Sequence, residues 1–443
     1  MMPKKTYYLL SLGCAKNLVD SNSMARLLDD SGFVSVERPA NAELLIVNTC
    51  GFIRPAVDES LDELRKLSKK KKKGQLLIAT GCLTERYRQH VAEQVPGIDG
   101  ILGTRRWMDI VDLVQQLRAE PQKPRYHLPE TPAVGTDEQG VLRAAIQGAN
   151  AYIKIADGCR RGCAFCAIPL IKGPQVSRPM DAILNDARTL QKMGIQELIL
   201  ISQDTTDYGS DLGMKDGLAR LLEQLISAVP DIPWIRILYA YPGFVTDHLI
   251  DVMAKNRQVL PYLDIPLQHA HPDVLKRMRR PSNMDWVYQT IAKMRTAMPE
   301  LALRTTFIVG YPGETEKEFQ TLLDFMQTMK FDHVGAFPFF FEKGTASEAL
   351  GDDVQEEVKQ ERIERLMTLQ QEISLVRNQS FVGKQLSVLI EGYNEGISVG
   401  RSYRDAPEID GMVFVDGEVP LNQIIPVKIS DALVHDLVGY PVK

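Results

Sequence analysis

The sequence predicts an α/β protein built from three parts. These are an N-terminal open parallel sheet, a central series of six β–α units forming a parallel sheet or barrel, and a small C-terminal β-barrel. Three observations support this class. Short apolar runs alternate with amphipathic stretches through most of the chain, a proline-rich stretch interrupts that alternation once, and short alternating runs replace it near the C-terminus.

The composition is that of an ordinary globular protein. With 443 residues the chain is long enough for several domains, and its 44% hydrophobic and 25% charged residues exclude wholesale disorder, collagen-like repeats and a coiled-coil rod. A net charge of −5 is too small to name a partner. The apolar runs are shorter than the ~20 residues of a membrane helix, and Tyr7–Leu12 is too short for a signal peptide. We therefore expect a cytoplasmic protein without a membrane partner.

The first domain, predicted over residues 5–119, carries three cysteines at equivalent places. The runs Tyr7–Leu12, Leu44–Val47 and Leu76–Thr80 resemble buried parallel strands, and helical stretches such as 21–30 and 57–67 fit between them. Each run leads into a cysteine, and the carboxyl ends of parallel strands meet at one edge of a sheet. Three such coincidences disfavour ordinary buried cysteines and favour a three-thiolate cluster site: Cys14, Cys50 and Cys82.

A second group of three cysteines has a C-x3-C-x2-C spacing: Cys159, Cys163 and Cys166. A structural zinc site normally takes four ligands, and disulfide formation would leave one thiol unpaired. A 4Fe-4S cluster held by three thiolates keeps one iron open for another ligand, so the spacing favours such a cluster.

The remaining organisation follows the same periodicities. Residues 120–144 are predicted to be a linker, 145–376 the central domain and 379–443 the terminal domain. An apolar stripe at helical spacing over 354–376 indicates a long helix between the last two domains. Six strands are expected in the central domain, at 152–155, 197–201, 234–239, 262–265, 303–309 and 333–337, and four in the terminal domain, at 386–390, 397–401, 412–415 and 425–429.

The C-x3-C-x2-C motif, with Phe165 before its last cysteine, resembles the signature of the radical S-adenosylmethionine enzymes. Over the whole chain the sequence resembles the methylthiotransferase family, on the strings SLGCAKNLVDS, VNTCGFI, TGCL and GCRRGCAFCAIP. The resemblance implies a three-cysteine N-terminal domain, a radical SAM core formed as a (β/α)6 partial TIM barrel, and a C-terminal TRAM domain with an OB-like β-barrel.

The resemblance also implies the cofactors and their sites. Two 4Fe-4S clusters would be held by the two cysteine groups, and the cluster at Cys159, Cys163 and Cys166 would bind S-adenosylmethionine. An electron donor such as flavodoxin or ferredoxin is implied. The string FIVGYPGE resembles the glycine motif of the family. The residues expected near S-adenosylmethionine are Ser202, Gln203, Gln268, Gly310, Gly313 and Glu314.

Within the family, the string GRSYRDAPEIDG resembles the ribosomal-protein aspartate methylthiotransferases, the RimO-like branch. This implies a transferase that uses two S-adenosylmethionine molecules for radical hydrogen abstraction, sulfur insertion and methyl transfer. Its target would be the β-carbon of an aspartate in small-subunit ribosomal protein S-twelve, free or in the ribosome. The alternatives are a tRNA adenosine methylthiotransferase with the same clusters and, from another class, a zinc-dependent RNA-binding scaffold.

The charge of the terminal domain favours a basic protein partner over RNA. Residues 381–443 contain five basic and nine acidic residues, whereas a domain that grips phosphates is expected to be basic. Three of the acids lie in one short stretch, and we expect them to form a negative surface: Asp405, Glu408 and Asp410.

Overall fold

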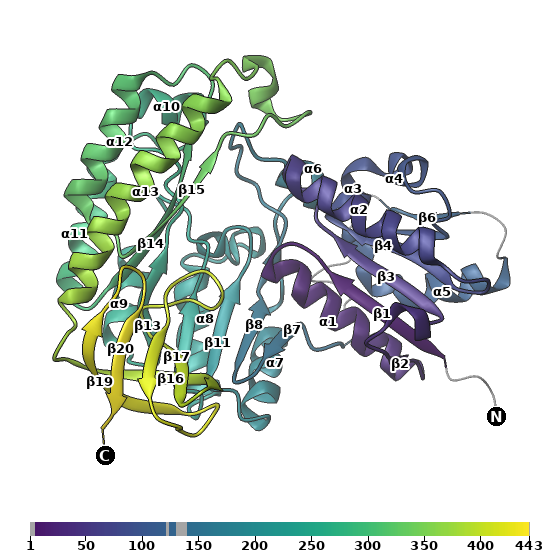
Figure 1. Cartoon of the computed structure of the whole chain (residues 1–443), viewed down its shortest axis with the longest axis horizontal. Helices are drawn as coiled ribbons and strands as arrows, with labels where there is room; N and C mark the ends of the chain where they lie inside the picture. The colour runs from purple at the N-terminus through teal and green to yellow at the C-terminus, as the bar shows by residue number, and fades with distance from the viewer. Residues whose placement is uncertain (1–4, 121–123, 130–139, 443) are drawn as a thin grey trace.

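The computed structural model describes residues 5–120, 124–129 and 140–442 and shows the predicted fold class (Figure 1). An N-terminal α/β unit lies on one side of a partial barrel, and a small closed β-barrel lies at one end of it. Within the described residues, no helix is both long enough and apolar enough to cross a membrane.

The N-terminal unit is a six-stranded, wholly parallel sheet with helices on both faces. Its strand order is β2-β1-β3-β4-β5-β6. Helices α1 and α5 pack on one face and α2 and α4 on the other, as the two separate apolar clusters of this unit show. The strands are β1 (Thr6–Ser11), β2 (Val34–Ser35), β3 (Leu44–Thr49), β4 (Leu76–Gly81), β5 (Gly100–Gly103) and β6 (Arg125–His127), and the helices are α1 (Ala15–Asp30), α2 (Arg54–Lys70), α3 (Cys82–Tyr87), α4 (Gln89–Gln94) and α5 (Ile110–Ala119).

The stretch proposed as a linker is only partly described. Residues 121–123 and 130–139 lie outside the described residues, while β6 falls between them and pairs in parallel with β5. A strand was not expected there, because three residues are too few to establish an alternation in the sequence.

The central sheet has the order β15-β14-β13-β12-β11-β8-β7 and is parallel apart from β7. Its six parallel strands follow one another in chain order with helices between them, as in an open partial barrel. The strands are β7 (Ala144–Gln147), β8 (Asn150–Lys154), β11 (Glu197–Ile201), β12 (Trp234–Ile237), β13 (Val259–Asp264), β14 (Ala302–Val309) and β15 (His333–Pro338), and the main helices are α7 (Met180–Lys192), α8 (Gly217–Ala228), α9 (Asp247–Lys255), α11 (Met284–Ala297) and α12 (Glu316–Met329). Four shorter elements lie between these: β9 (Ala156–Asp157), α6 (Ile168–Lys172), β10 (Val176–Ser177) and α10 (Pro272–Arg277).

The two faces of the central sheet have different partners. Leu198 and Leu200 of β11 face the outer helices, while Ile199 and Ile201 face a cluster that also contains Val19 of α1 and Leu389 of the terminal domain. The other two domains therefore cover the concave face of the partial barrel.

Helix α13 (Glu356–Gln379) packs along β15 and leads into the terminal domain. That domain is a closed barrel of order β16-β17-β18-β20-β19 around a small apolar core. Its strands are β16 (Gln385–Asn394), β17 (Ile397–Ser402), β18 (Val413–Asp416), β19 (Ile424–Ala432) and β20 (Leu437–Pro441), of which β20 was not predicted.

Candidate functional site

All six cysteines line a single cavity of about 330 Å³ between the N-terminal unit and the partial barrel. The two groups of three therefore face the same space, although they belong to different domains. All six side chains are free thiols. Apart from the cysteines, the walls are formed by Lys16, Asn17, Phe52, Arg161, Phe165, Ile168, Lys172, Gln203, Tyr239, Ala240, Tyr241, Pro266, Gln268 and Arg280.

The first group lies at the carboxyl ends of neighbouring strands. Cys14 follows β1 and caps α1, Cys50 follows β3, and Cys82 is the first residue of α3 after β4. The amide of Asn17 ties these ends together, because it donates to the carbonyls of Leu12 and Thr49 at 3.0 Å each. The cysteines are thus held by a hydrogen-bonded set of strand ends.

Glycine is required beside this group. Gly13 has a φ of +92°, and a Cβ there would lie 3.2 Å from Sγ of Cys50. Gly81, directly before Cys82, has a φ of +103° and packs against the backbone of Thr49. Side chains at either position would be strained and would push into the strand ends that carry the thiols.

The second group lies on the loop between β9 and α6. The amide of Arg161 approaches Sγ of Cys159 at 3.4 Å, and the amide of Cys166 donates to the carbonyl of Cys163 at 3.1 Å. From the far side of the barrel mouth, the guanidinium of Arg280 reaches Sγ of Cys163 at 3.5 Å. The loop therefore folds back on itself and brings its three thiols to one wall of the cavity.

Burial suppresses ionisation of most of these thiols. It raises the pKa of Cys82 and of Cys166 to about 12 and that of Cys159 to about 11, and it also raises the pKa of Cys50. The thiolate is the form that binds metal, so loading such a site releases protons.

Among the residues with described positions, no three His, Cys, Asp or Glu side chains converge on a point where they could hold one metal ion. In a multi-iron cluster each thiolate takes a different iron, so a cluster does not require the three thiols to converge on one point.

Two of the six residues predicted near S-adenosylmethionine, Gln203 and Gln268, line the cavity. Among the residues that the structure describes, their side-chain carbonyl oxygens are buried without a hydrogen-bond partner, as is the hydroxyl of the neighbouring Ser202. Gln268 also has an unusual φ of +74°. Buried polar atoms without partners are rare in folded proteins, and acceptors facing a cavity suit a ligand that brings donors.

The glycine motif does not line the cavity. A Cβ at Gly310 would collide with the side chain of Lys359 from α13, and the amide of Gly313 donates to Asp353 at 2.9 Å. Glu314 accepts from the amide of Tyr311 at 3.0 Å, and its other oxygen lies 3.5 Å from the guanidinium of Arg362 and 3.8 Å from Nε2 of the buried His269. These residues therefore hold neighbouring segments together around the mouth of the barrel.

The sequence reasoning missed several cavity residues, above all Lys16, Tyr239 and Arg280. Lys16 lies inside the string CAKN, but a single lysine gives no signal without the fold. Burial lowers the pKa of Lys16, and its ammonium lies 3.1 Å from the centroid of the Tyr239 ring. Tyr239 itself has a φ of +62°, which is uncommon for an aromatic residue. The guanidinium of Arg280 lies over the ring of Tyr241.

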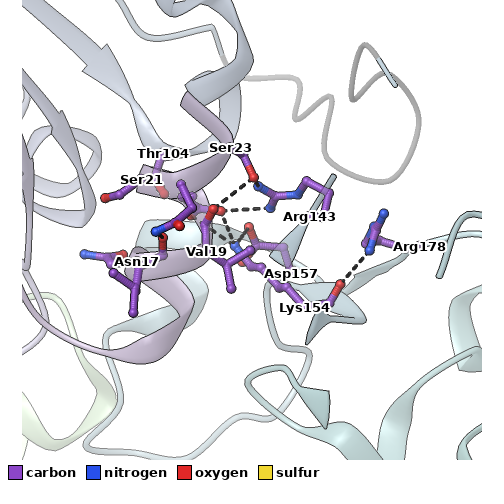
Figure 2. Close-up of polar contacts among 12 residues, drawn as sticks. Asn17, Val19, Ser21, Ser23, Thr104, Arg143, Lys154, Asp157 and Arg178 are labelled. Atoms are coloured by element: carbon purple, nitrogen blue, oxygen red, sulfur yellow. Dashed lines mark hydrogen bonds and ion pairs between the residues drawn. The ribbon is translucent and has the colours of Figure 1, made fainter. Parts of the chain in front are cut away.

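A buried ion network joins the domains beside the cavity (Figure 2). Asp20 of α1 accepts from Lys154 of β8 at 2.9 Å and from Arg143 at 2.8 Å, and its other oxygen lies 3.3 Å from the ammonium of Lys172 in α6. Asp157 pairs with both lysines, at 2.7 and 3.3 Å. Asp20, Asp157 and Lys172 follow or precede the cysteines closely in sequence, so this network fixes the two cysteine groups relative to each other.

The prediction that three acids form a negative surface on the terminal domain is wrong for two of them. Asp405 is buried and accepts from the hydroxyl of Ser402 at 2.7 Å. Asp410 accepts from the hydroxyl of Tyr262 at 2.6 Å and lies 3.3 Å from Nε of Arg304. Both carboxylates therefore bond at the junction with the partial barrel, and of the three only Glu408 is exposed.

Comparison with protein families divides the chain into the same three parts. Residues 6–103 match the uncharacterized protein family UPF0004, residues 153–326 match the radical SAM superfamily, and residues 382–442 match the TRAM domain.

Whole-length relatives are similar over almost the entire chain. The ribosomal protein uS12 methylthiotransferase RimO of Chloroflexus aurantiacus is 45% identical, covering 98% of this chain and 99% of its own. The enzyme of the same name from a Synechocystis species is 44% identical, covering 97% and 96%. Among solved structures, the radical S-adenosylmethionine methyltransferase TsrM of Kitasatospora setae is similar in fold, with a TM-score of 0.57 at 12% identity over 86% of this chain and 80% of its own.

Proposed function

Because this chain belongs to the family of the ribosomal protein uS12 methylthiotransferases, we propose that it attaches a methylthio group to the β-carbon of an aspartate in uS12, the small-subunit protein S-twelve. One observation carries the proposal: both groups of three cysteines open into one cavity. Such a site brings a radical-forming centre and a sulfur-carrying centre to the same substrate carbon, as methylthiolation requires.

We propose that each cysteine group holds a 4Fe-4S cluster with one iron left for a further ligand. Cys159, Cys163 and Cys166 would hold the cluster that binds S-adenosylmethionine, and Cys14, Cys50 and Cys82 the cluster that serves sulfur transfer. When bound, the first cluster supplies the electron for reductive cleavage of S-adenosylmethionine, which an external donor such as flavodoxin or ferredoxin replenishes. The free carbonyl oxygens of Gln203 and Gln268 suit the ammonium and hydroxyl donors of S-adenosylmethionine.

The remaining walls protect and orient the reacting groups. Phe52, Phe165, Ile168 and Tyr239 give the cavity a largely apolar lining, which limits the water that would quench a radical. Arg161 is held by Asp204 at 2.7 Å and lies 3.6 Å from the centroid of the Phe244 ring, so this side of the mouth is stiffened beside Cys159.

The overall change replaces one C–H bond of the aspartate by a C–S–CH₃ group. One S-adenosylmethionine molecule accepts the hydrogen through its cleaved fragment, a second provides the methyl group, and the sulfur comes from the centre at the N-terminal cysteines. The chain holds the aspartate between the two centres. We infer that this takes place in the cytoplasm, where ribosomal proteins are made and assembled.

An anaerobic assay tests the proposal directly. The reconstituted enzyme receives small ribosomal subunits, free uS12 and tRNA together, with S-adenosylmethionine and a reductant, and all products are read by mass spectrometry. Methylthiolated uS12 and about eight irons per chain are expected. Methylthiolated tRNA would instead support the alternative substrate, and a zinc-loaded, inactive protein would support the scaffold.

A further inference from the structure

Lys16 places a buried positive charge in the cavity without a carboxylate partner. Its side chain lies on the first turn of α1, two residues after Cys14, and is 8% exposed. Among the described residues it makes no hydrogen bond and no ion pair, and its one close polar contact is the face of the Tyr239 ring. An isolated ammonium in such a place is costly, so the site favours an anionic ligand.

The neighbouring carboxylates are already engaged elsewhere. Asp264, at the end of β13, pairs with Arg304 at 3.0 Å, and Asp157 pairs with Lys154 at 2.7 Å. No acidic side chain is among those lining the cavity. Two sources of negative charge therefore remain for Lys16: the thiolate of Cys14, two residues before it, and a molecule that enters the cavity.

The other cationic side chains that line the cavity contact other groups. Lys172 has two carboxylates, and Arg161 has Asp204. Arg280 has no carboxylate partner among the described residues either. Its guanidinium donates to the carbonyl of Pro266 and approaches Cys163, so it lies beside the cysteine group proposed to bind S-adenosylmethionine. On the side of the N-terminal cysteines, Lys16 is the cation available to a substrate.

On these grounds, and resting on the proposed function, we propose that Lys16 binds the side-chain carboxylate of the substrate aspartate. The bond to be broken is on the β-carbon, which is attached directly to that carboxylate. A salt bridge to Lys16 would therefore hold the β-carbon beside the N-terminal cysteines, and it would select aspartate over asparagine, whose amide brings no charge. Lys16 is thus a specificity-determining residue.

Binding measurements with matched substrates test this assignment. The reconstituted, anaerobic enzyme is titrated with uS12 and with uS12 carrying Asn at the modified position. The wild-type enzyme is expected to bind the aspartate form about 30-fold or more tightly, as for a buried charge pair. In Lys16→Met this preference disappears because only the aspartate form loses affinity. Lys16→Arg restores part of it, while Lys66→Met, at an exposed lysine of α2, keeps it all.

Three results would overturn the assignment. The first is equal binding of both uS12 forms by the wild-type enzyme, which needs no variant to fold. The second is an undiminished preference in Lys16→Met. The third is loss of iron from Lys16→Met, measured before substrate is added, since the charge would then serve the cysteine site. An enzyme that never modifies uS12 would instead refute the proposed function, so the two failures are distinguishable.

Discussion

At the scale of single residues, each cysteine group offers three thiols, and we propose a different task for each group. We predict that Cys163→Ala and Cys50→Ala each lose about half of the iron, because each removes one of three thiolates from one cluster site. Only Cys163→Ala should abolish cleavage of S-adenosylmethionine. Cys50→Ala should still release 5′-deoxyadenosine but transfer no sulfur. Iron analysis with product chromatography checks both, and wild-type iron content in Cys50→Ala would contradict a second cluster.

Two acids in the same stretch of the terminal domain differ sharply in environment. The side chain of Asp410 is buried against Tyr262 and Arg304, whereas Glu408 is exposed and accepts from the side-chain amide of Gln147 at 2.7 Å. We predict that Asp410→Asn lowers the free energy of unfolding by about 2–4 kcal/mol, because it removes a buried charge from its partners. Glu408→Gln should change it by less than about 0.5 kcal/mol. Thermal unfolding compares the pair, and equal midpoints would refute the interpretation.

At the scale of elements, α12 begins with a capping box. Thr315 accepts from the amide of Glu318 at 3.3 Å, and the carboxylate of Glu318 accepts from the amide of Thr315 at 2.7 Å. Burial alone would raise the pKa of Glu318, but hydrogen bonds from Arg277 and Thr315 outweigh it and lower the pKa to about 2.

The sign of the resulting pH effect follows from that lowered pKa. The carboxylate stabilises the fold fully above the pKa of the unfolded chain, about 4.3, and the contribution is lost as the pH falls towards 2. We predict that Glu318→Gln costs about 1 kcal/mol near pH 7 and that its difference from wild type shrinks below pH 4. Urea unfolding at several pH values measures this. A difference independent of pH would show that the carboxylate charge does not matter.

At the scale of the whole molecule, contacts across the domain boundary create the site. The buried ion network joins Asp20 of the N-terminal unit to Lys154 and Lys172 of the barrel. We predict that Asp20→Asn destabilises the protein by about 3 kcal/mol, because it removes the carboxylate charge that Arg143, Lys154 and Lys172 share. Sulfur transfer should fall more than S-adenosylmethionine cleavage, which needs only the barrel. Asp62→Asn, at an exposed acid of α2, is the matched control. Equal losses of the two half-reactions would contradict a role in alignment.

The terminal domain is attached by a second buried network. Glu197 of β11 binds Arg236 at 2.6 Å and Arg401 of β17 at 2.7 Å, and Arg401 also binds Glu391. Burial opposes ionisation of Glu197, yet the two guanidinium groups hold its pKa below the ordinary value. The concave face of the partial barrel is therefore closed partly by charge pairs and partly by the apolar cluster around Val19 and Leu389.

The sequence by itself determined the fold class and the strand ends at which the six cysteines lie. It could do so because strand and helix periodicities, and the spacing of a cysteine motif, are local properties of the chain. Very short strands such as β6 were not predicted from the sequence. Strand β12 ends at Ile237, two residues before its predicted end and shortly before Tyr239, which has a positive φ. Local pattern is weakest where an element is brief or a backbone is strained.

Only the tertiary structure decided that both cysteine groups share one cavity, that Lys16 faces it with no carboxylate partner among the described residues, and that Asp405 and Asp410 are interior. Each of these depends on contacts between residues more than a hundred positions apart, such as Asp20 with Lys154 and Tyr262 with Asp410. An acid in a polar stretch has the same sequence pattern whether water or an arginine faces it. Its environment is set by which domain surface docks there, because docking removes the water and supplies the opposite charge.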